Sequence, residues 1–297
     1  MGDNGRCGYA AIIGRPNAGK STFFNAALGQ RFSIVTSKPQ TTRTRIVGVL
    51  TRGSTQTVFL DTPGLLEPSY RLHHFMVGQA ERSATEADVA LLLVDGTRPF
   101  DRFDLVANLV GRLHVPLIAA INKIDKVPLE RLSGMVEEVR TRLGLDEVLT
   151  MSALRGQHVD ETLDQLEQRL PFGPKLYPDD MIAEQPERFF VAEFIRQAAF
   201  DQLTDELPYS IEVTIDEFRD AAGPDKTYIH ATLFVERESQ KGIVIGRKAS
   251  RLRSIGSAAR KEVEILLDRP VFLDLRVKVR PDWRDKDRDL KEFGYGE

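Results

Sequence analysis

The feature that most constrains the fold is the segment GRPNAGKS, Gly14–Ser21, which fits the phosphate-loop pattern G-x-x-x-x-G-K-[ST]. An apolar stretch precedes it and a helix-forming stretch follows it. Glycines let the backbone wrap phosphate oxygens closely, and successive N–H groups and the helix N-terminus supply positive potential. The segment predicts a strand–loop–helix unit that holds a nucleotide, with Lys20 on the β and γ phosphates and Ser21 on Mg²⁺.

The pattern around this loop predicts an α/β domain of the P-loop nucleotide-binding class. Up to about residue 170, short apolar runs alternate with amphipathic helical stretches, which indicates βα units and a mostly parallel sheet. Between Arg45 and Asp61, two strand patterns joined by a tight polar turn predict one antiparallel hairpin at the sheet edge. The expected strands otherwise cover 8–14, 89–95, 115–121 and 147–151, and the expected helices cover 19–28, 69–87, 101–112, 129–142 and 158–169.

A second domain is expected after a proline-rich segment. Four prolines lie within 171–186 and interrupt any regular element, so we place a linker at 172–186, between domains 1–171 and 187–297. The C-terminal domain has the predicted order αββααβ. Five of these elements are expected at 187–204, 209–218, 227–236, 248–267 and 271–279, with a glycine-bearing turn before the helix at 248–267 and a short charged helix in the tail.

Composition places the chain among ordinary globular proteins. Its 297 residues are 41% hydrophobic and 29% charged, with a net charge of −3. No apolar run approaches the eighteen or so residues that a membrane-spanning helix needs. The N-terminal sequence lacks the pattern of a secretory signal, and Cys7 is the single cysteine, which excludes an intrachain disulfide. We therefore expect a cytoplasmic protein.

The tetrapeptide Asn122-Lys123-Ile124-Asp125 points to guanine rather than adenine. It follows a buried strand end, where α/β sheets place their ligands. The Asp125 carboxylate can accept two N–H bonds from the guanine edge that adenine does not offer. Asn122 and Lys123 are expected to brace the loop and pack beside the base. The backbone N–H groups of Ser152 and Ala153, after the last strand, are expected to face guanine O6.

Two further segments are expected to respond to the γ-phosphate. Asp61 ends a strand and fits the acidic residue that holds Mg²⁺, directly or through water. Gly64 offers a backbone N–H to the γ-phosphate. The other segment is the polar loop QRFSIVTSKPQTTRTR, in which Thr42 is the first choice for the Mg²⁺ threonine and Thr41 the second. The alternative is that both are ordinary surface threonines.

Taken together, these motifs resemble those of the Era family of P-loop GTPases, because GRPNAGKST, QTTR, DTPG, NKID and SA stand in the family's order. The resemblance implies a slow, Mg²⁺-dependent GTPase that acts in assembly of the small (30S) ribosomal subunit by binding the 3′ end of its 16S rRNA. A monomer is expected, with at most a weak peripheral contact to the inner face of the cell membrane. Nucleotide contacts are expected from Gly14, Asn17, Ala18, Gly19, Lys20, Ser21, Thr22, Asp61, Gly64, Asn122, Lys123, Asp125, Ser152 and Ala153.

The residue after Gly64 raises a question about catalysis. Leu65 stands where Ras-like GTPases place the glutamine that orients the attacking water. Several GTPases similar to this chain use a K⁺ ion held by the asparagine of the phosphate loop, and Asn17 occupies that position. The resemblance thus implies Asn17, Lys20, Thr42 and Gly64 as the catalytic set. Alternatively, Asn17 stabilises only its own turn.

The C-terminal domain resembles the prokaryotic K homology (KH) fold, type II, in which a GxxG loop clamps the backbone of about four nucleotides. Here the loop reads Gly246-Arg247-Lys248-Ala249, with alanine in place of the second glycine. The window 237–261 carries eight basic residues and one acidic residue, which suggests phosphate contact. Ile243, Ile245 and Ile255 either form an apolar floor for bases or belong to an ordinary core. RNA contacts are expected from Lys241, Ile243, Ile245, Gly246, Arg247, Lys248, Ala249, Arg251 and Arg253.

Two other functions remain to be weighed against this one. In a membrane-associated regulatory GTPase that couples growth or the cell cycle, the basic face would meet anionic lipid instead of RNA. No lipidation motif or strongly amphipathic anchor favours this reading. A metabolic P-loop ATPase or kinase is disfavoured by NKID and by the absence of a small-substrate domain.

Overall fold

The computed structural model describes residues 5–36, 38–100, 103–220 and 226–296. It divides into two compact units. The first takes in most of the chain up to Glu184, and the second begins at Gln185 and also includes the short segments 34–41 and 70–72. The proline-rich segment 172–186, predicted as the linker, thus contains the boundary between the two units.

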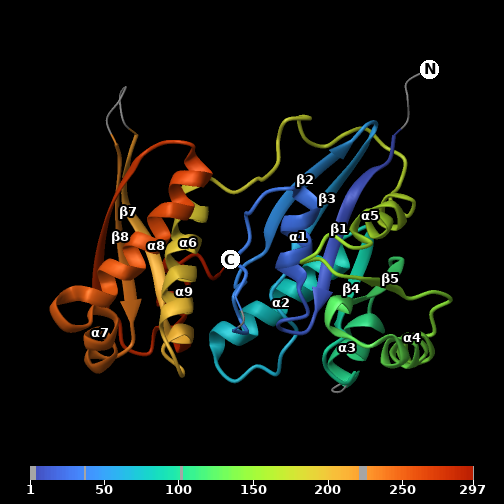
Figure 1. Cartoon of the computed structure of the whole chain (residues 1–297), viewed down its shortest axis with the longest axis horizontal. Coiled ribbons are helices and arrows are strands. Elements are labelled where there is room, and N and C mark those ends of the chain that lie inside the picture. The colour runs from blue at the N-terminus through green and yellow to red at the C-terminus, as the bar shows by residue number, and fades with distance from the viewer. Residues whose placement is uncertain (1–4, 37, 101–102, 221–225, 297) are drawn as a thin grey trace. The chain divides into compact units, whose positions relative to one another are not determined.

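The first unit is built on a six-stranded sheet (Figure 1) with the strand order β2-β3-β1-β4-β5-β6. The strands β3, β1, β4, β5 and β6 run parallel, and β2 pairs antiparallel with β3 at the edge, which confirms the predicted fold class. The strands are β1 (Cys7–Gly14), β2 (Ile46–Arg52), β3 (Thr55–Asp61), β4 (Val89–Asp95), β5 (Leu117–Asn122) and β6 (Leu149–Met151).

Helices cover both faces of this sheet. Apolar side chains of α2, α3 and α4 pack with alternate residues of the strands in one large buried cluster. The helices α1 and α5 contact each other on the opposite side. The bounds are α1 (Lys20–Leu28), α2 (Arg71–Glu86), α3 (Phe103–Val110), α4 (Leu129–Leu143) and α5 (Val159–Glu167). Residues 101–102, which were predicted to begin the third helix, lie outside the described residues.

The proline-rich segment is held against the first unit by a buried glutamine on β3. Gln56 Oε1 accepts hydrogen bonds from the backbone N–H groups of Leu176 and Tyr177, each at 2.9 Å. Its Nε2 donates to the Tyr177 carbonyl at 2.9 Å. Further along, the N–H of Val49 on β2 donates to the Ile182 carbonyl at 2.8 Å. The segment therefore extends the edge of the sheet beside β2.

The second unit has the predicted order αββααβ. Its three-stranded sheet has the order β7-β8-β9, with β7 antiparallel and β9 parallel to β8. Side chains of α6 and α8 pack on the sheet in a single buried cluster. In the tail, Trp283 is fully buried and its Nε1 donates to the Ser210 carbonyl at 2.9 Å. The elements are α6 (Glu187–Gln202), β7 (Glu212–Arg219), β8 (Thr227–Val235), α7 (Glu238–Ile245), α8 (Ser250–Leu267), β9 (Val271–Val279) and α9 (Asp287–Glu292).

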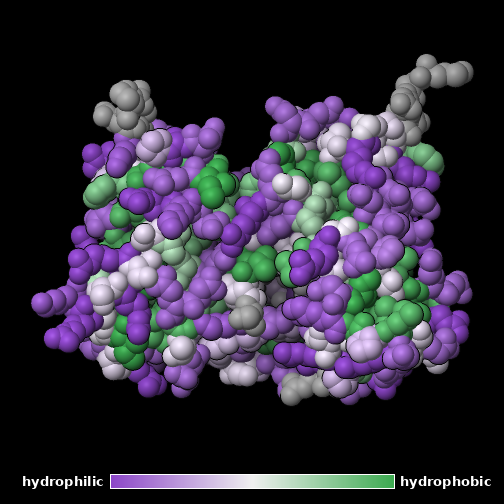
Figure 2. Space-filling view, in the orientation of Figure 1, coloured by the Kyte–Doolittle hydropathy of each residue, from purple (hydrophilic) through white to green (hydrophobic). Residues whose placement is uncertain are grey.

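The surface in view is mostly hydrophilic, with hydrophobic residues in small separate patches (Figure 2). In the described part of the chain, no helix combines the length and the apolar character needed to cross a membrane.

Candidate functional site

The phosphate loop lies between the end of β1 at Gly14 and the start of α1 at Lys20. Gly19 precedes the helix with φ 95°, a left-handed conformation that favours glycine. A Cβ at this position would lie 2.1 Å from Asn122 Nδ2, so a side chain there would displace the asparagine. Asn17 is partly buried and also has a left-handed backbone, with φ 65°. The strand and helix on either side therefore hold a tight turn of the kind the motif predicts.

The Lys20 ammonium is buried in this turn. Its Nζ donates to the carbonyl oxygens of Gly14 at 3.2 Å and of Arg15 at 3.1 Å. Burial lowers the pKa of Lys20 to about 8, because desolvation disfavours the charged form, and the nearby Asp61 carboxylate opposes that shift. A bound phosphate would supply the missing negative charge. The site is therefore suited to an anionic ligand.

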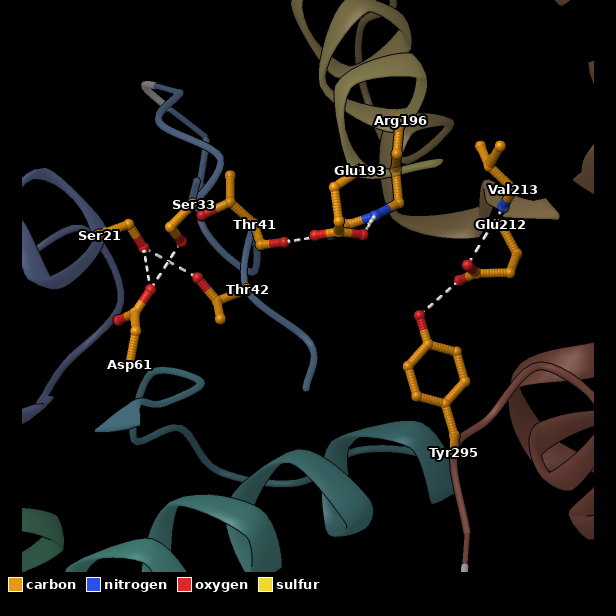
Figure 3. A network of polar contacts seen from close by, with 10 residues as sticks. All are labelled: Ser21, Ser33, Thr41, Thr42, Asp61, Glu193, Arg196, Glu212, Val213 and Tyr295. Carbon is orange, nitrogen blue, oxygen red and sulfur yellow. Dashed lines mark hydrogen bonds and ion pairs between the residues drawn. The ribbon is translucent and has the colours of Figure 1, made fainter. Parts of the chain in front are cut away.

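Next to Lys20 lies a cluster of hydroxyl groups around one carboxylate, formed by Ser21, Ser33, Thr42 and Asp61 (Figure 3). Ser21 Oγ donates to Asp61 Oδ2 at 2.9 Å and lies 2.9 Å from Thr42 Oγ1. Thr42, the first choice of the two threonines, is 5% exposed. The three residues predicted to bind Mg²⁺ are therefore brought together, although they come from three separate motifs.

The chemistry of this cluster fits Mg²⁺. Asp61 Oδ1 is buried and has no hydrogen-bond partner among the described residues, so one carboxylate oxygen remains for a cation. Burial raises the pKa of the Asp61 carboxyl, whereas Ser33, Lys20, Ser21 and Thr42 favour its ionised form. Mg²⁺ is usually bound by one or two carboxylates together with substrate phosphates and water, and hydroxyl ligands of this kind complete P-loop sites.

Ser33 was not predicted from the sequence, yet it belongs to the same cluster. It is fully buried, and its Oγ donates to Asp61 Oδ2 at 2.6 Å. It stands between Phe32 and Ile34 in a loop, where a serine carries no distinctive pattern. Only the folded loop brings its hydroxyl to the carboxylate.

The segment after Asp61 turns back towards the phosphate loop. A Cβ on Gly64 would lie 2.7 Å from the Pro16 nitrogen, so this close approach requires glycine. The backbone N–H of Leu65 donates to the Gly14 carbonyl at 3.0 Å. The Leu65 side chain is 5% exposed and belongs to the hydrophobic cluster beneath the sheet. It therefore serves as a core residue in this structure.

Asn122 connects three loops at the end of β5. Its Nδ2 donates to the Ala18 carbonyl at 2.9 Å. Its Oδ1 accepts from the backbone N–H of Lys123 at 2.8 Å and from that of Ala153 at 3.0 Å. Lys123 has a left-handed backbone, with φ 69°, and its Nζ pairs with Asp95 Oδ2 at 2.8 Å. Through these bonds, Asn122 and Lys123 hold the neighbouring loops in place.

Asp125 is exposed at the rim, and Ser152 Oγ donates to its Oδ1 at 2.6 Å. The backbone N–H groups of the last loop, predicted to face guanine O6, already have acceptors within the protein. The N–H of Ser152 donates to the Gln157 carbonyl and the N–H of Ala153 donates to Asn122. These N–H groups therefore satisfy the protein's own carbonyl and amide oxygens, because the loop is closed by its own turn. A base oxygen would have to compete with these bonds.

In the second unit, the loop between α7 and α8 presents the other predicted site. Gly246 has φ 71°, and a Cβ there would lie 2.9 Å from the Arg251 Cβ. Lys248 and Ala249 are also left-handed, with φ 49° and 59°. Arg251 Nη1 donates to the Ile243 carbonyl at 3.2 Å. Two consecutive non-glycine residues therefore adopt a conformation that favours glycine.

A groove of about 330 Å³ lies between α8 and the edge strand β9. Arg253 was predicted to contact RNA and lines this groove. Gly256, Ser257 and Arg260 also line the groove, but they were not among the residues predicted to contact RNA. A signal was present, because the spacing 253, 256, 257, 260 places these residues on one face of a helix. A Cβ on Gly256 would lie 3.2 Å from a methyl group of Leu275, so this glycine lets the helix and strand approach closely.

The sequence left open whether Ile243, Ile245 and Ile255 form an apolar floor for bases or belong to the core, and their exposure differs. Ile243 is 48% exposed and Ile245 is partly buried. Ile255 is completely buried in the core cluster of this unit, so a role for Ile255 as a floor for bases is wrong. The helical period puts residue 255 on the face of α8 opposite to the groove-facing residues 253, 256, 257 and 260, so its side chain points to the core.

Replacing Ala249 with glycine should stabilise the second unit. At φ 59° an L side chain costs about 1–2 kcal/mol, and the extra freedom of glycine in the unfolded chain offsets part of that. We expect Ala249→Gly to raise the free energy of unfolding by about 1 kcal/mol, measured by urea denaturation.

The matched control is Ala258→Gly, within α8, which should lower the same free energy by about 1 kcal/mol because its backbone is helical. Equal destabilisation by both variants would show that residue 249 is not strained.

Comparisons with known proteins agree with this geometry. The family model described as 50S ribosome-binding GTPase matches residues 9–123, and the KH domain model matches residues 206–284. A variant of Era from Aquifex aeolicus bound to GDP and AlF4⁻ is 41% identical, with a TM-score of 0.93 over 98% of this chain and 100% of that one.

A second solved structure is Era in complex with MgGDPNP and nucleotides 1506–1542 of 16S ribosomal RNA. It is also 41% identical, with a TM-score of 0.94 over 98% of this chain and 99% of that one. Because the 41% identity extends across both units, and because one family model matches in each unit, the chain belongs to the Era family of GTPases.

Proposed function

We propose that this protein is a GTP-binding and slowly GTP-hydrolysing switch that acts as a monomer. In this proposal it binds the 3′ end of 16S rRNA and assists maturation of the 30S subunit. The observation that carries the proposal is the linkage made by Asn122, which ties the phosphate loop to the tetrapeptide that ends in Asp125. Its support from relatives is that Era has been solved with GDP and AlF4⁻, and with MgGDPNP and 16S rRNA nucleotides.

Guanine selection would depend on the Asp125 carboxylate. One of its oxygens already accepts from Ser152 Oγ, which fixes the rotation of the carboxylate at the rim. The guanine N1–H and 2-amino group could each donate to a carboxylate held in this way, and adenine has no matching donors. Lys123 would pack beside the base, since its side chain is anchored to Asp95 at 2.8 Å.

The substitution Asp125→Asn should exchange guanine for xanthine specificity. The amide can donate to the extra carbonyl of xanthine, while it loses the charged acceptor for guanine. We expect calorimetry to show GDP affinity reduced by about a hundredfold or more, and xanthosine diphosphate affinity raised. Asp146→Asn, at another exposed aspartate, is the control and should leave both affinities unchanged. Retained preference for GDP in Asp125→Asn would refute the assignment.

Hydrolysis would proceed without a glutamine. Mg²⁺, when bound with the nucleotide, would screen the phosphate charge. Ser21, Thr42 and Asp61 would hold it, Lys20 would hold the β and γ phosphates, and Gly64 would offer its N–H to the γ-phosphate. The buried position of Leu65 supports a role for its side chain in packing rather than in orienting water.

Asn17 is our candidate ligand for a K⁺ ion that offsets charge in the transition state. It lies in the phosphate loop with a left-handed backbone, at φ 65°. We expect GTP hydrolysis to be faster in K⁺ than in Na⁺ by about tenfold or more, since one fixed charge at a transition state has effects of this order. Asn17→Ala should remove the difference and keep the slower rate.

The same K⁺ and Na⁺ comparison with Asn108→Ala, at an exposed asparagine of α3, should match the wild type. Equal rates of the wild-type protein in the two salts would dismiss the role of Asn17, which would then stabilise only its own turn.

RNA binding would use the loop Gly246–Ala249 and the groove between α8 and β9. The groove is lined by Arg253 and Arg260, and the sequence around it has a strong excess of basic residues. Exposed Ile243 lies beside the loop and offers an apolar contact to a base. Lys241, Ile245, Arg247, Lys248 and Arg251 complete the proposed contact surface. A phosphate backbone clamped at the loop, with bases in the groove, is the mode that KH domains use.

A double substitution, Arg247→Glu with Lys248→Glu, should test whether this loop binds RNA. We expect it to weaken binding of an oligonucleotide from the 3′ end of 16S rRNA by about tenfold or more in fluorescence anisotropy. The charge-matched control is Arg131→Glu with Arg169→Glu, at exposed sites of the first unit, which should bind normally. Binding to vesicles of anionic phospholipid without binding to RNA would favour the membrane-associated alternative.

A further inference from the structure

Ser33 has the environment of a residue with a specific task. It lies in the loop after α1, outside every recognised motif, and is completely buried. Its hydroxyl donates a short hydrogen bond, 2.6 Å, to Asp61 Oδ2 (Figure 3). Burying a hydroxyl and a carboxylate is costly unless each has a hydrogen-bond partner, and here the two groups bond each other.

Asn25 on α1 holds the backbone of Ser33 in place. Asn25 Oδ1 accepts from the backbone N–H groups of Phe32 at 3.0 Å and of Ser33 at 2.9 Å. Its Nδ2 donates to the Ser33 carbonyl at 2.8 Å. Three hydrogen bonds from one helical side chain therefore fix the backbone on either side of the Ser33 Cα. The Ser33 Cα is thereby held where its side chain can reach Asp61.

The two oxygens of Asp61 are consequently used in different ways. Oδ2 receives the hydroxyl groups of Ser33 and Ser21, at 2.6 Å and 2.9 Å. Oδ1 is buried and has no hydrogen-bond partner in the described part of the chain. The terminal torsion of an aspartate is otherwise broad and nearly two-fold. The donors on Oδ2 remove that freedom and leave Oδ1 as the oxygen for a cation or its water.

We infer that Ser33 is a positioning residue for the Mg²⁺ site, and that Asn25 acts through it. This inference rests on the proposed function, because it assumes a Mg²⁺–nucleotide complex at this cluster. Donor groups behind metal-binding carboxylates orient them, and their removal typically costs 10–100-fold in metal affinity. Ser33 does not touch the nucleotide in this account, so its effect should fall on Mg²⁺ and not on the base or the phosphates.

The test measures Mg²⁺ affinity rather than turnover. Dissociation of a fluorescent GDP analogue is followed while free Mg²⁺ is titrated with EDTA buffers. We expect Ser33→Ala to raise the half-saturating Mg²⁺ concentration by about tenfold or more. Affinity for the analogue in excess EDTA should stay within about twofold of the wild type, because the base and phosphate contacts remain. Ser33→Thr keeps the hydroxyl and should restore most of the Mg²⁺ affinity.

Two further variants separate positioning from general stability. Asn25→Ala leaves both serine hydroxyls in the chain but removes the anchor, so it should reproduce the Mg²⁺ defect. In the same loop, the Thr36 hydroxyl bonds the backbone of Lys38 and does not reach Asp61. The variant Thr36→Ala should therefore have the Mg²⁺ affinity of the wild type. Thermal unfolding of each variant shows that the folded protein is being titrated.

The inference fails if Ser33→Ala requires no more Mg²⁺ than the wild type. It fails equally if this variant loses the same affinity in EDTA as in Mg²⁺, because that loss would mark a structural role. A wild-type protein whose GDP complex does not respond to Mg²⁺ at all would refute the proposed Mg²⁺ site itself, together with the role of Ser33. The wild-type titration therefore distinguishes failure of the site from failure of the positioning residue alone.

Discussion

The nucleotide site depends on a single side-chain amide. Asn122 is 2% exposed and bonds to the phosphate loop, to its own tetrapeptide and to the loop after β6. The donor and the acceptor of one amide are thus shared among three chain segments that are far apart in sequence. Gly19 is the counterpart of this arrangement, because any Cβ there would overlap the amide nitrogen. The phosphate and base subsites are therefore held at a fixed separation by packing and hydrogen bonds within one rigid core.

The proposed cation subsite follows a different principle. Its hydroxyl groups come from α1 and from the loop after α1, and they gather around one buried carboxylate at the end of β3. Burial alone would favour the neutral acid, so the hydroxyl donors and the nearby Lys20 are what favour the charge. Ser33 and Thr42 of one loop both take part in this cluster, so a cation bound there as proposed would act directly on that loop. Coupling of this kind is what the proposed switch requires.

The second unit shows how a binding loop tolerates an unfavourable residue. Ala249 occupies a left-handed position, and its neighbour Lys248 does as well. Strain of this kind persists where the surrounding structure fixes the backbone. Here Gly246 packs against Arg251 at the start of α8, so the loop is held from both ends. Strain in a rigid surface loop is consistent with a site shaped for a ligand rather than for stability.

Much of this protein could be predicted from its sequence. The period of apolar residues and the spacing of short motifs were enough to predict the α/β class, the antiparallel edge hairpin and the order αββααβ, because each depends on local pattern. The same motifs singled out Lys20, Asn122 and Asp125 as candidate site residues. The tertiary structure alone decided that Ser33 joins the hydroxyl groups around Asp61 and that Asn25 holds the Ser33 backbone. It also decided that Ile255 is core, that the N–H groups of Ser152 and Ala153 are already bonded, and that α8 and β9 form a groove. These features depend on which distant segments meet. Helical spacing can show that residues share one face, but it does not show which segment packs against that face, and a single loop residue shows neither.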